Sequence, residues 1–179
     1  MRKSIFACTL ACVIAAPAGA LTLESADIQE GKSLEQTFLF NGFGCSGENL
    51  SPQLSWKDVP QGSKSLAITV YDPDAPSGSG WHHWVAIDIP ISVNGLERGQ
   101  GTEGKMPQGS RLIRNDFSIK DFGGACPPQG HGVHRYQFTL WALPYEKMAV
   151  PDDASAALVG FMLNAEALSH KTITTVFNR

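Results

Sequence analysis

The stretch of sequence that decides the fold lies between two strand-like segments and reads Tyr71-Asp72-Pro73-Asp74-Ala75-Pro76-Ser77-Gly78-Ser79-Gly80-Trp81-His82-His83-Trp84. It brings together two carboxylates, two adjacent histidines and two tryptophans, which are groups able to hold a small polar ligand. Pro73 and Pro76 restrict the backbone directly after a strand. We therefore expect Asp72 and Asp74 to be fixed at a strand end, as the first part of a candidate binding site.

Side-chain alternation divides the end of this stretch between the two faces of a strand. Trp81 and His83 are expected on one face, and His82 and Trp84 on the opposite face. At most one of the two histidines would then enter a given pocket.

Apolar and β-branched runs on both sides of this stretch predict further strands. The expected strands cover residues 37–40, 54–56, 65–71, 84–89, 135–143 and 172–177. One helix is expected, capped by Asp152 or Asp153 and running through Leu168. Its predicted sheet-facing side consists of the apolar residues that recur at helical spacing, Leu158, Phe161, Met162, Ala165 and Leu168. The fold class is therefore mainly β, a β-rich α+β domain with one main helix.

A second polar cluster lies at the start of the strongest predicted strand. Pro127-Pro128-Gln129-Gly130 forms a rigid loop, and in the strand that follows His134 and Tyr136 share a face, with Arg135 opposite. Together the two clusters predict a pocket, which consists of Asp72, Asp74, His83, His134 and Tyr136, with Trp81 as an apolar wall.

These residue types suit an anion or a phosphoryl group, because N–H and O–H donors and partly protonated imidazole bind such groups. Asp72 or Asp74 would orient a histidine by accepting its second N–H. The same residues fit a structural role equally well, with the carboxylates capping turns and the histidines satisfied within a sheet.

Other chemistries have weaker support in the sequence. Two histidines and a carboxylate could form a metal triad, but the H-x-x-x-H and H-x-H spacings common in such sites are absent. No second acidic cluster faces Asp72 and Asp74, as glycosidase acid/base chemistry would require. Residues 42–47 fit G-x-G-x-x-G, but turn-forming residues follow where a dinucleotide fingerprint needs a helix. We expect no metal, no cofactor and no enzymatic activity.

The amino terminus predicts export. Residues 1–20 combine Arg2 and Lys3, an uncharged and mostly apolar run, and a final Ala18-Gly19-Ala20, which is typical of a cleaved signal peptide. No later segment is long enough to span a membrane as a helix. We expect one mature domain over residues 21–179, located in the periplasm or secreted. In that compartment Cys45 and Cys126 would form a disulfide.

The charge balance excludes one class of partner. Of the 14 Lys and Arg residues, two lie in the predicted leader, whereas all 17 Asp and Glu residues lie beyond it. Nucleic-acid binding depends on clustered Lys and Arg that neutralise phosphates. We therefore expect no nucleic-acid partner.

The motifs at 72–76, 81–84, 127–130 and 134–136, in this order, resemble the signature of the phosphatidylethanolamine-binding protein (PEBP) family, which includes the Raf kinase inhibitor proteins. The Gly-rich loop around Cys45, the Cys126-Pro127-Pro128 junction and the leader look like the bacterial YbhB/YbcL branch. The resemblance implies a large central antiparallel sheet packed on a smaller sheet, with peripheral helices. It also implies a small pocket for phosphate-like groups and phospholipid headgroups, formed by Asp72, Asp74, Trp81, His83, Pro127, His134 and Tyr136.

The leading hypothesis is an exported, non-enzymatic protein that binds a phosphorylated or otherwise anionic small group. In this hypothesis His83 and His134 donate to the anion, Tyr136 and backbone N–H groups complete the cradle, and Asp72 and Asp74 fix the imidazoles. Two alternatives belong to other classes: a protein-interaction module that inhibits a partner kinase or protease, and an unrecognised hydrolase. The oligomeric state is open, with a homodimer as one option.

Overall fold

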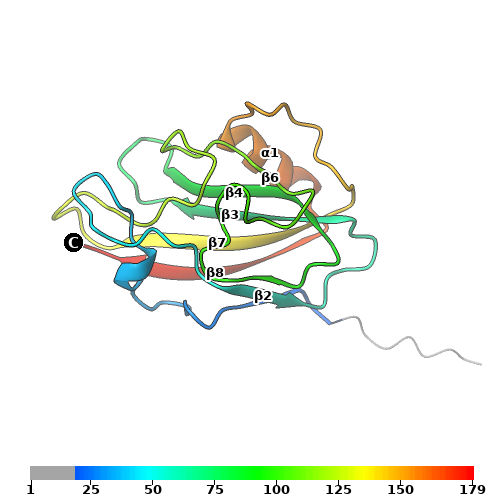
Figure 1. The fold of residues 1–179 in the computed structure, drawn as a ribbon, viewed down its shortest axis with the longest axis horizontal. Helices are drawn as coiled ribbons and strands as arrows, with labels where there is room; N and C mark the ends of the chain where they lie inside the picture. Colours follow the sequence, from blue (N-terminus) through cyan, green and yellow to red (C-terminus); the bar gives the residue numbers. More distant parts are fainter. Residues whose placement is uncertain (1–18) are drawn as a thin grey trace, which may run out of the picture.

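The computed structural model describes residues 19–179 (Figure 1). The predicted signal peptide falls almost wholly on residues 1–18 and so lies outside the described residues. The described part of the chain contains two antiparallel sheets, one α-helix and one short 3-10 helix. None of its helices is long and apolar enough to cross a membrane.

The larger sheet has its strands in the order β6-β4-β3-β7-β8, each antiparallel to its neighbours. In chain order these strands are β3 (Ser65–Asp72), β4 (Trp81–Pro90), β6 (Arg111–Leu112), β7 (His134–Leu143) and β8 (Ser169–Phe177). The strands predicted at 65–71, 84–89, 135–143 and 172–177 are confirmed, and each is longer than predicted. β3 lies at the centre and is buried along almost its whole length, because both of its edges are paired and core clusters cover both of its faces.

The smaller sheet consists of β1 (Thr22–Glu24), β2 (Leu54–Lys57) and β5 (Gly95–Leu96), in the order β1-β2-β5. It packs against the inner face of the larger sheet. The core between them contains side chains of both sheets, among them Leu54 and Trp56 of β2 and Leu66, Ile68 and Val70 of β3. The predicted architecture, a large antiparallel sheet packed on a smaller one, is confirmed.

The helix α1 (Ala156–Glu166) lies against the outer face of the larger sheet. The predicted cap at Asp152 or Asp153 is wrong, because the Ser155 hydroxyl accepts from the N–H of Leu158 at 3.2 Å and begins the helix. The helix also ends at Glu166, before the predicted Leu168.

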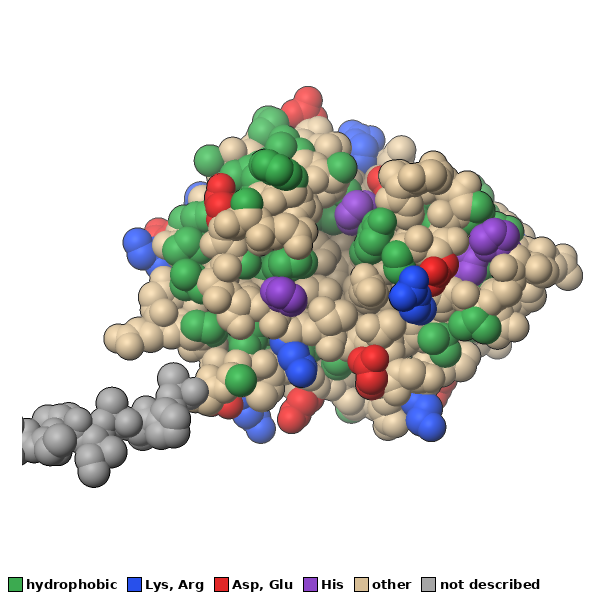
Figure 2. Space-filling model, turned by 180° about the vertical axis from the view of Figure 1, so that it is seen from behind, with side chains coloured by type: hydrophobic (Ala, Val, Ile, Leu, Met, Phe, Trp, Pro, Cys, Tyr) green, Lys and Arg blue, Asp and Glu red, His purple; other side chains and the backbone are tan. Residues whose placement is uncertain are grey.

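The predicted sheet-facing side of α1 is also wrong, except for Met162, which is partly buried against the same core cluster. Ala156, Val159 and Leu163 are buried against the sheet, whereas Phe161 is 72% exposed and Leu158 41%. Figure 2 shows hydrophobic side chains at the surface in the upper part of the molecule, where α1 lies. The helix is apolar on more than one side, so helical spacing alone does not select the face that packs.

Residues 37–40 do not form the predicted strand. The chain instead makes a 3-10 helix over Gln36–Phe38, in which the N–H groups of Phe38 and Leu39 bond to carbonyls three residues earlier. Phe38 is buried in the core between the sheets. Leu39 makes only an isolated parallel bridge with Ala125.

The predicted disulfide between Cys45 and Cys126 is present, with a sequence separation of 81. It joins the loop at 42–47 to the segment that leads into β7. These two segments come from distant parts of the chain and lie at the same end of the larger sheet.

Removing this disulfide is expected to lower the free energy of unfolding by up to about 4.5 kcal/mol, because the crosslink restricts the unfolded chain. Urea unfolding with and without a reductant measures the effect. The Cys45→Ala/Cys126→Ala variant is the control and should unfold at the same urea concentration in both conditions. Equal midpoints for the oxidised protein and this variant would contradict a stabilising role.

Candidate ligand-binding site

A cavity of about 350 Å³ opens at the end of the larger sheet where β3 ends and β4 and β7 begin. Antiparallel pairing places the last residue of β3, Asp72, beside the first residue of β4, Trp81. β7 pairs with the other edge of β3, so its first residues reach the same end. The structure thus brings together the two predicted clusters, and six predicted site residues line the cavity: Asp72, Trp81, His83, Pro127, His134 and Tyr136.

His83 is the extra residue of a β-bulge. Val70 pairs with Trp84 and the next residue of β3, Tyr71, pairs with His82, so His83 is left without a partner on β3. Bulges re-aim side chains in this way and are common near functional sites. Trp81 and His83 both line the cavity, and His82 borders a groove on the opposite face, as alternation predicts.

The prediction for Trp84 is wrong, for the same reason. The bulge turns Trp84 to the inner face, where it is fully buried and its ring meets Phe122 edge-on. A sequence pattern with a strict period of two does not show where an extra residue enters a strand.

The imidazole of His83 is fixed by two backbone carbonyls. Its Nδ1 lies 2.8 Å from the oxygen of Gly123 and 3.1 Å from the oxygen of Gly124. Carbonyl oxygens only accept, so Nδ1 carries a hydrogen and the neutral ring presents a lone pair at Nε2. Burial lowers the pKa of His83, although the carbonyls and the Asp72 carboxylate act in the opposite direction. The expectation that His83 donates to an anion is therefore wrong for the neutral ring.

The segment that carries these carbonyls is held close to the bulge. The N–H of Gly123 donates to the carbonyl of His83 at 2.9 Å, and the amide of Asn115 donates to the same carbonyl at 2.8 Å. Gly124 passes so close to Phe38 that a Cβ at this position would lie 2.4 Å from its carbonyl oxygen. Glycine is therefore required at position 124, and its small size lets the two carbonyls reach the imidazole.

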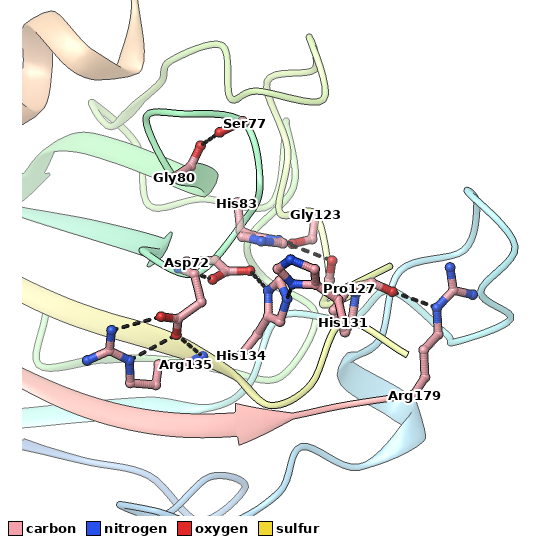
Figure 3. Close-up of polar contacts among 12 residues, drawn as sticks. Asp72, Ser77, Gly80, His83, Gly123, Pro127, His131, His134, Arg135 and Arg179 are labelled. Carbon is pink, nitrogen blue, oxygen red and sulfur yellow. Dashed lines mark hydrogen bonds and ion pairs between the residues drawn. The ribbon is translucent and has the colours of Figure 1, made fainter. Parts of the chain in front are cut away.

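A chain of hydrogen bonds links Asp72, His134 and His131 (Figure 3). Oδ2 of Asp72 lies 2.7 Å from Nδ1 of His134, which must donate because a carboxylate only accepts. Nε2 of His134 lies 2.8 Å from Nδ1 of His131. Asp72 thus orients His134, as the sequence predicts, and His131 contacts the ring nitrogen that a ligand would use.

Asp74 is placed differently from the prediction. Its carboxylate accepts from the side chain of Arg135 at 2.8 and 2.9 Å and from the Arg135 backbone N–H at 2.9 Å, outside the cavity wall. The Arg135 guanidinium lowers the pKa of Asp74 to about 2. Asp74 therefore joins the turn after β3 to the start of β7, and the expectation that it orients a histidine is wrong.

Two buried donors in the wall have no hydrogen-bond partner within residues 19–179, the indole Nε1 of Trp81 and the hydroxyl of Tyr136. Burial and, to a smaller extent, the negative charge of Asp72 raise the pKa of Tyr136, so it keeps its proton. Buried polar groups are normally satisfied, and unpaired ones require an explanation. A bound acceptor would supply it.

Sequence reasoning missed several residues around the cavity. Phe43 and Phe117 line its rim, and the Phe117 ring meets Trp81 and His83 edge-on, with ring centroids 5.2 and 5.3 Å apart. Phe43 lies in the Gly-rich loop, where composition gave no sign that it would reach the site. His131 had a weak signal, since it precedes His134 by three residues and lies between two glycines.

The wall contains no Lys or Arg among the described residues. Its acidic side chain is Asp72, and its histidines, His83 and His134, carry a positive charge only when they are protonated. Residues 19–179 also contain no group of three or more His, Cys, Asp or Glu side chains placed to hold a metal ion. The cavity can therefore provide hydrogen-bonding groups and a histidine–carboxylate pair, and aromatic and proline side chains surround them.

Comparisons with known proteins agree with this fold. Residues 24–178 match the family model described as phosphatidylethanolamine-binding protein. YbcL of Escherichia coli is 47% identical over 99% of this chain and 98% of its own length, and YbhB of the same organism is 43% identical over 88% and 100%. A protein of Mycobacterium tuberculosis, named as the lipoprotein LppC, is 38% identical over 57% of this chain and 47% of its own length.

The solved structure of E. coli YbcL, described as a new member of the mammalian PEBP family, superimposes with a TM-score of 0.87 and covers 90% of this chain and 99% of its own. The family match extends from the last residue of β1 through β8 and includes every residue of the cavity wall. This chain therefore belongs to the phosphatidylethanolamine-binding protein family, in which it resembles the YbcL and YbhB proteins.

Proposed function

We propose that this protein binds a small anionic group of the phosphate type in the cavity at the end of β3. The observation that carries the proposal is the pair of buried, unpartnered donors in the wall, the Trp81 indole N–H and the Tyr136 hydroxyl. An oxyanion supplies the acceptors that these donors lack.

His134 is the third contributor to binding. Its Nδ1–H donates to Asp72 at 2.7 Å, and protonation of the ring would place a positive charge beside the carboxylate and a second N–H at Nε2. His131 now occupies that nitrogen at 2.8 Å. An anion that reaches His134 displaces His131 from this nitrogen. The residues on either side of His131 are Gly130 and Gly132, and both have positive φ angles.

Binding without chemical conversion is favoured by the hydroxyl groups of the wall. The Ser77 hydroxyl donates to the carbonyl of Gly80 and not to an imidazole (Figure 3). Tyr136 holds its proton because burial raises its pKa. A hydrolase nucleophile requires a base within hydrogen-bond reach, so the arrangement supports a binding protein more than an enzyme.

We also propose that the protein works outside the cytoplasm. The leader-like residues 1–20 support this, as do the Cys45–Cys126 disulfide and the likeness to a protein named as a lipoprotein. Inhibition of a kinase or protease, hydrolysis and homodimer formation stay predictions, because no contact described here favours one of them.

Tyr136→Phe is expected to weaken binding of inorganic phosphate by about tenfold, because one hydrogen bond to a charged group is lost while the ring packing stays. Calorimetric titration near pH 6 measures it. Tyr145→Phe is the matched control, since Tyr145 is a half-buried tyrosine whose hydroxyl is also buried but lies outside the cavity wall. Unchanged affinity in Tyr136→Phe would remove Tyr136 from the site, and no phosphate binding by the unaltered protein would refute the proposed function.

Expression in a bacterial host tests the location. The periplasmic fraction should contain a protein whose intact mass corresponds to residues 21–179 with the disulfide formed. An Ala20→Tyr variant should accumulate uncleaved, because signal peptidase sites require small residues. Recovery of the full-length protein from the cytoplasm, with Cys45 and Cys126 reduced, would contradict export.

A further inference from the structure

We infer that the ligand of this cavity is an oxyacid that brings its own proton, namely a phosphomonoester monoanion or dihydrogen phosphate, in preference to a phosphodiester or a fully ionised oxyanion. The P–O–H group of the ligand donates to Nε2 of His83, while its charged oxygens accept from Tyr136 and Trp81. This inference rests on the proposed function and names the class of anion.

The first step is the position of the hydrogen on His83. The contacts of Nδ1 with Gly123 and Gly124, at 2.8 and 3.1 Å, are possible only if Nδ1 donates. Within residues 19–179 these are the hydrogen bonds of this ring, so Nε2 is left with a lone pair and no donor. His83 is 3% exposed and lies in the cavity wall, so the donor must come from a molecule in the cavity.

The second step is the protonation state of the ring. The carboxylates of Asp72 and Asp116 and the two glycine carbonyls favour the imidazolium, whereas burial disfavours it more strongly and lowers the pKa of His83. The remaining neighbours are aromatic, since Phe117 and Tyr136 meet the ring edge-on with centroids 5.3 and 5.2 Å away. At neutral pH His83 is therefore an acceptor.

The third step is the charge that faces the ligand. Asp72 accepts from the N–H of Asp74 at 2.8 Å and from His134 at 2.7 Å, and it is the acidic side chain in the wall of a cavity that has no Lys or Arg among the described residues. A second negative charge on the ligand would meet this carboxylate at close range. The wall therefore favours a monoanion over a dianion.

A phosphomonoester monoanion satisfies all three conditions, because it carries one O–H and a single negative charge. A phosphodiester and sulfate have no O–H at neutral pH and would direct an oxygen lone pair at the lone pair of His83. They can bind only after His83 takes up a proton, against the effect of burial. A phospholipid headgroup is a diester and belongs to this disfavoured class.

The pH dependence follows with a definite sign. Phosphomonoesters lose their second proton near pH 6, so their affinity should fall as the pH rises from 6 to 8. Phosphodiester and sulfate do not titrate in this range, and their weak binding should improve as the pH falls, because acid protonates His83. The ratio of the monoester affinity to the diester affinity should therefore decrease as the solution becomes more acidic.

Calorimetric titration of the purified, oxidised protein at pH 6.5 tests the inference with two matched pairs of probes. Phosphoethanolamine and glycerophosphoethanolamine share an ethanolamine group and differ as monoester and diester. Phosphate and sulfate share size and shape, and at this pH they differ in the proton and in the one unit of charge that goes with it. The monoester and phosphate should bind at least about tenfold more tightly than their partners, as expected for the loss of a hydrogen bond to a buried acceptor.

The outcomes separate the two proposals. Equal affinities within both pairs would contradict the preference for a ligand that carries a proton. They would not contradict the proposal that the cavity binds an anion. Absence of heat with every probe would overturn the proposed function and this inference together.

A variant gives an independent test. His83→Gln places an amide N–H near the position of Nε2 and should bind sulfate at least as tightly as phosphate, provided that its thermal melting shows a folded protein. His82→Gln, on the opposite face of β4, is the control and should keep the preference for phosphate. A preference for phosphate retained in folded His83→Gln would contradict the role of His83, and if this variant does not fold, the two pairs of probes decide alone.

Discussion

Two glycine carbonyls accept hydrogen bonds from the His83 imidazole, and these bonds determine the hydrogen-bonding properties of the cavity. These bonds, at 2.8 and 3.1 Å, fix which ring nitrogen carries the hydrogen and which one is left as an acceptor in the cavity wall. They exist because β4 has a bulge at His83 and because the segment at 123–124 lies directly beside it. The fold therefore determines which nitrogen of His83 donates and which one accepts, independently of any ligand.

The elements around this contact keep it in place. Gly124 packs against Phe38 where any side chain would collide, and Asn115 binds the carbonyl of the bulge residue. The disulfide at Cys126 joins the next part of the chain to the loop that carries Phe43. Asp72, by contrast, orients His134 from within the sheet, so the two histidines of the cavity are fixed by different means and offer different chemistry.

Much of this arrangement could be predicted from the sequence. Periodicity identified four of the five strands of the larger sheet, and alternation placed Trp81 and His83 on the same face because the bulge shifts the alternation only after His83. Trp84 was misplaced because a bulge has no signature in the hydrophobic pattern. The sheet-facing side of α1 was misassigned because the helix is apolar on several sides.

The role of Asp74 depends on a contact between distant residues, which no local pattern reveals. Its partner is Arg135, and the pair consists of residues 61 positions apart. The sense of the hydrogen bonds of His83 likewise depends on carbonyls 40 and 41 residues away. The side chains predicted from residue types thus line the cavity, with the exception of Asp74, whereas the donor and acceptor pattern of the cavity required the tertiary structure.

The protonation state of His83 is the central claim, and nitrogen-15 NMR of the histidine side chains near pH 7 measures it directly. A His83 variant assigns the signal. We expect a neutral ring with a protonated Nδ1 and an unprotonated Nε2, before and after phosphate is added. A hydrogen on Nε2, in either the neutral or the charged ring, would contradict it.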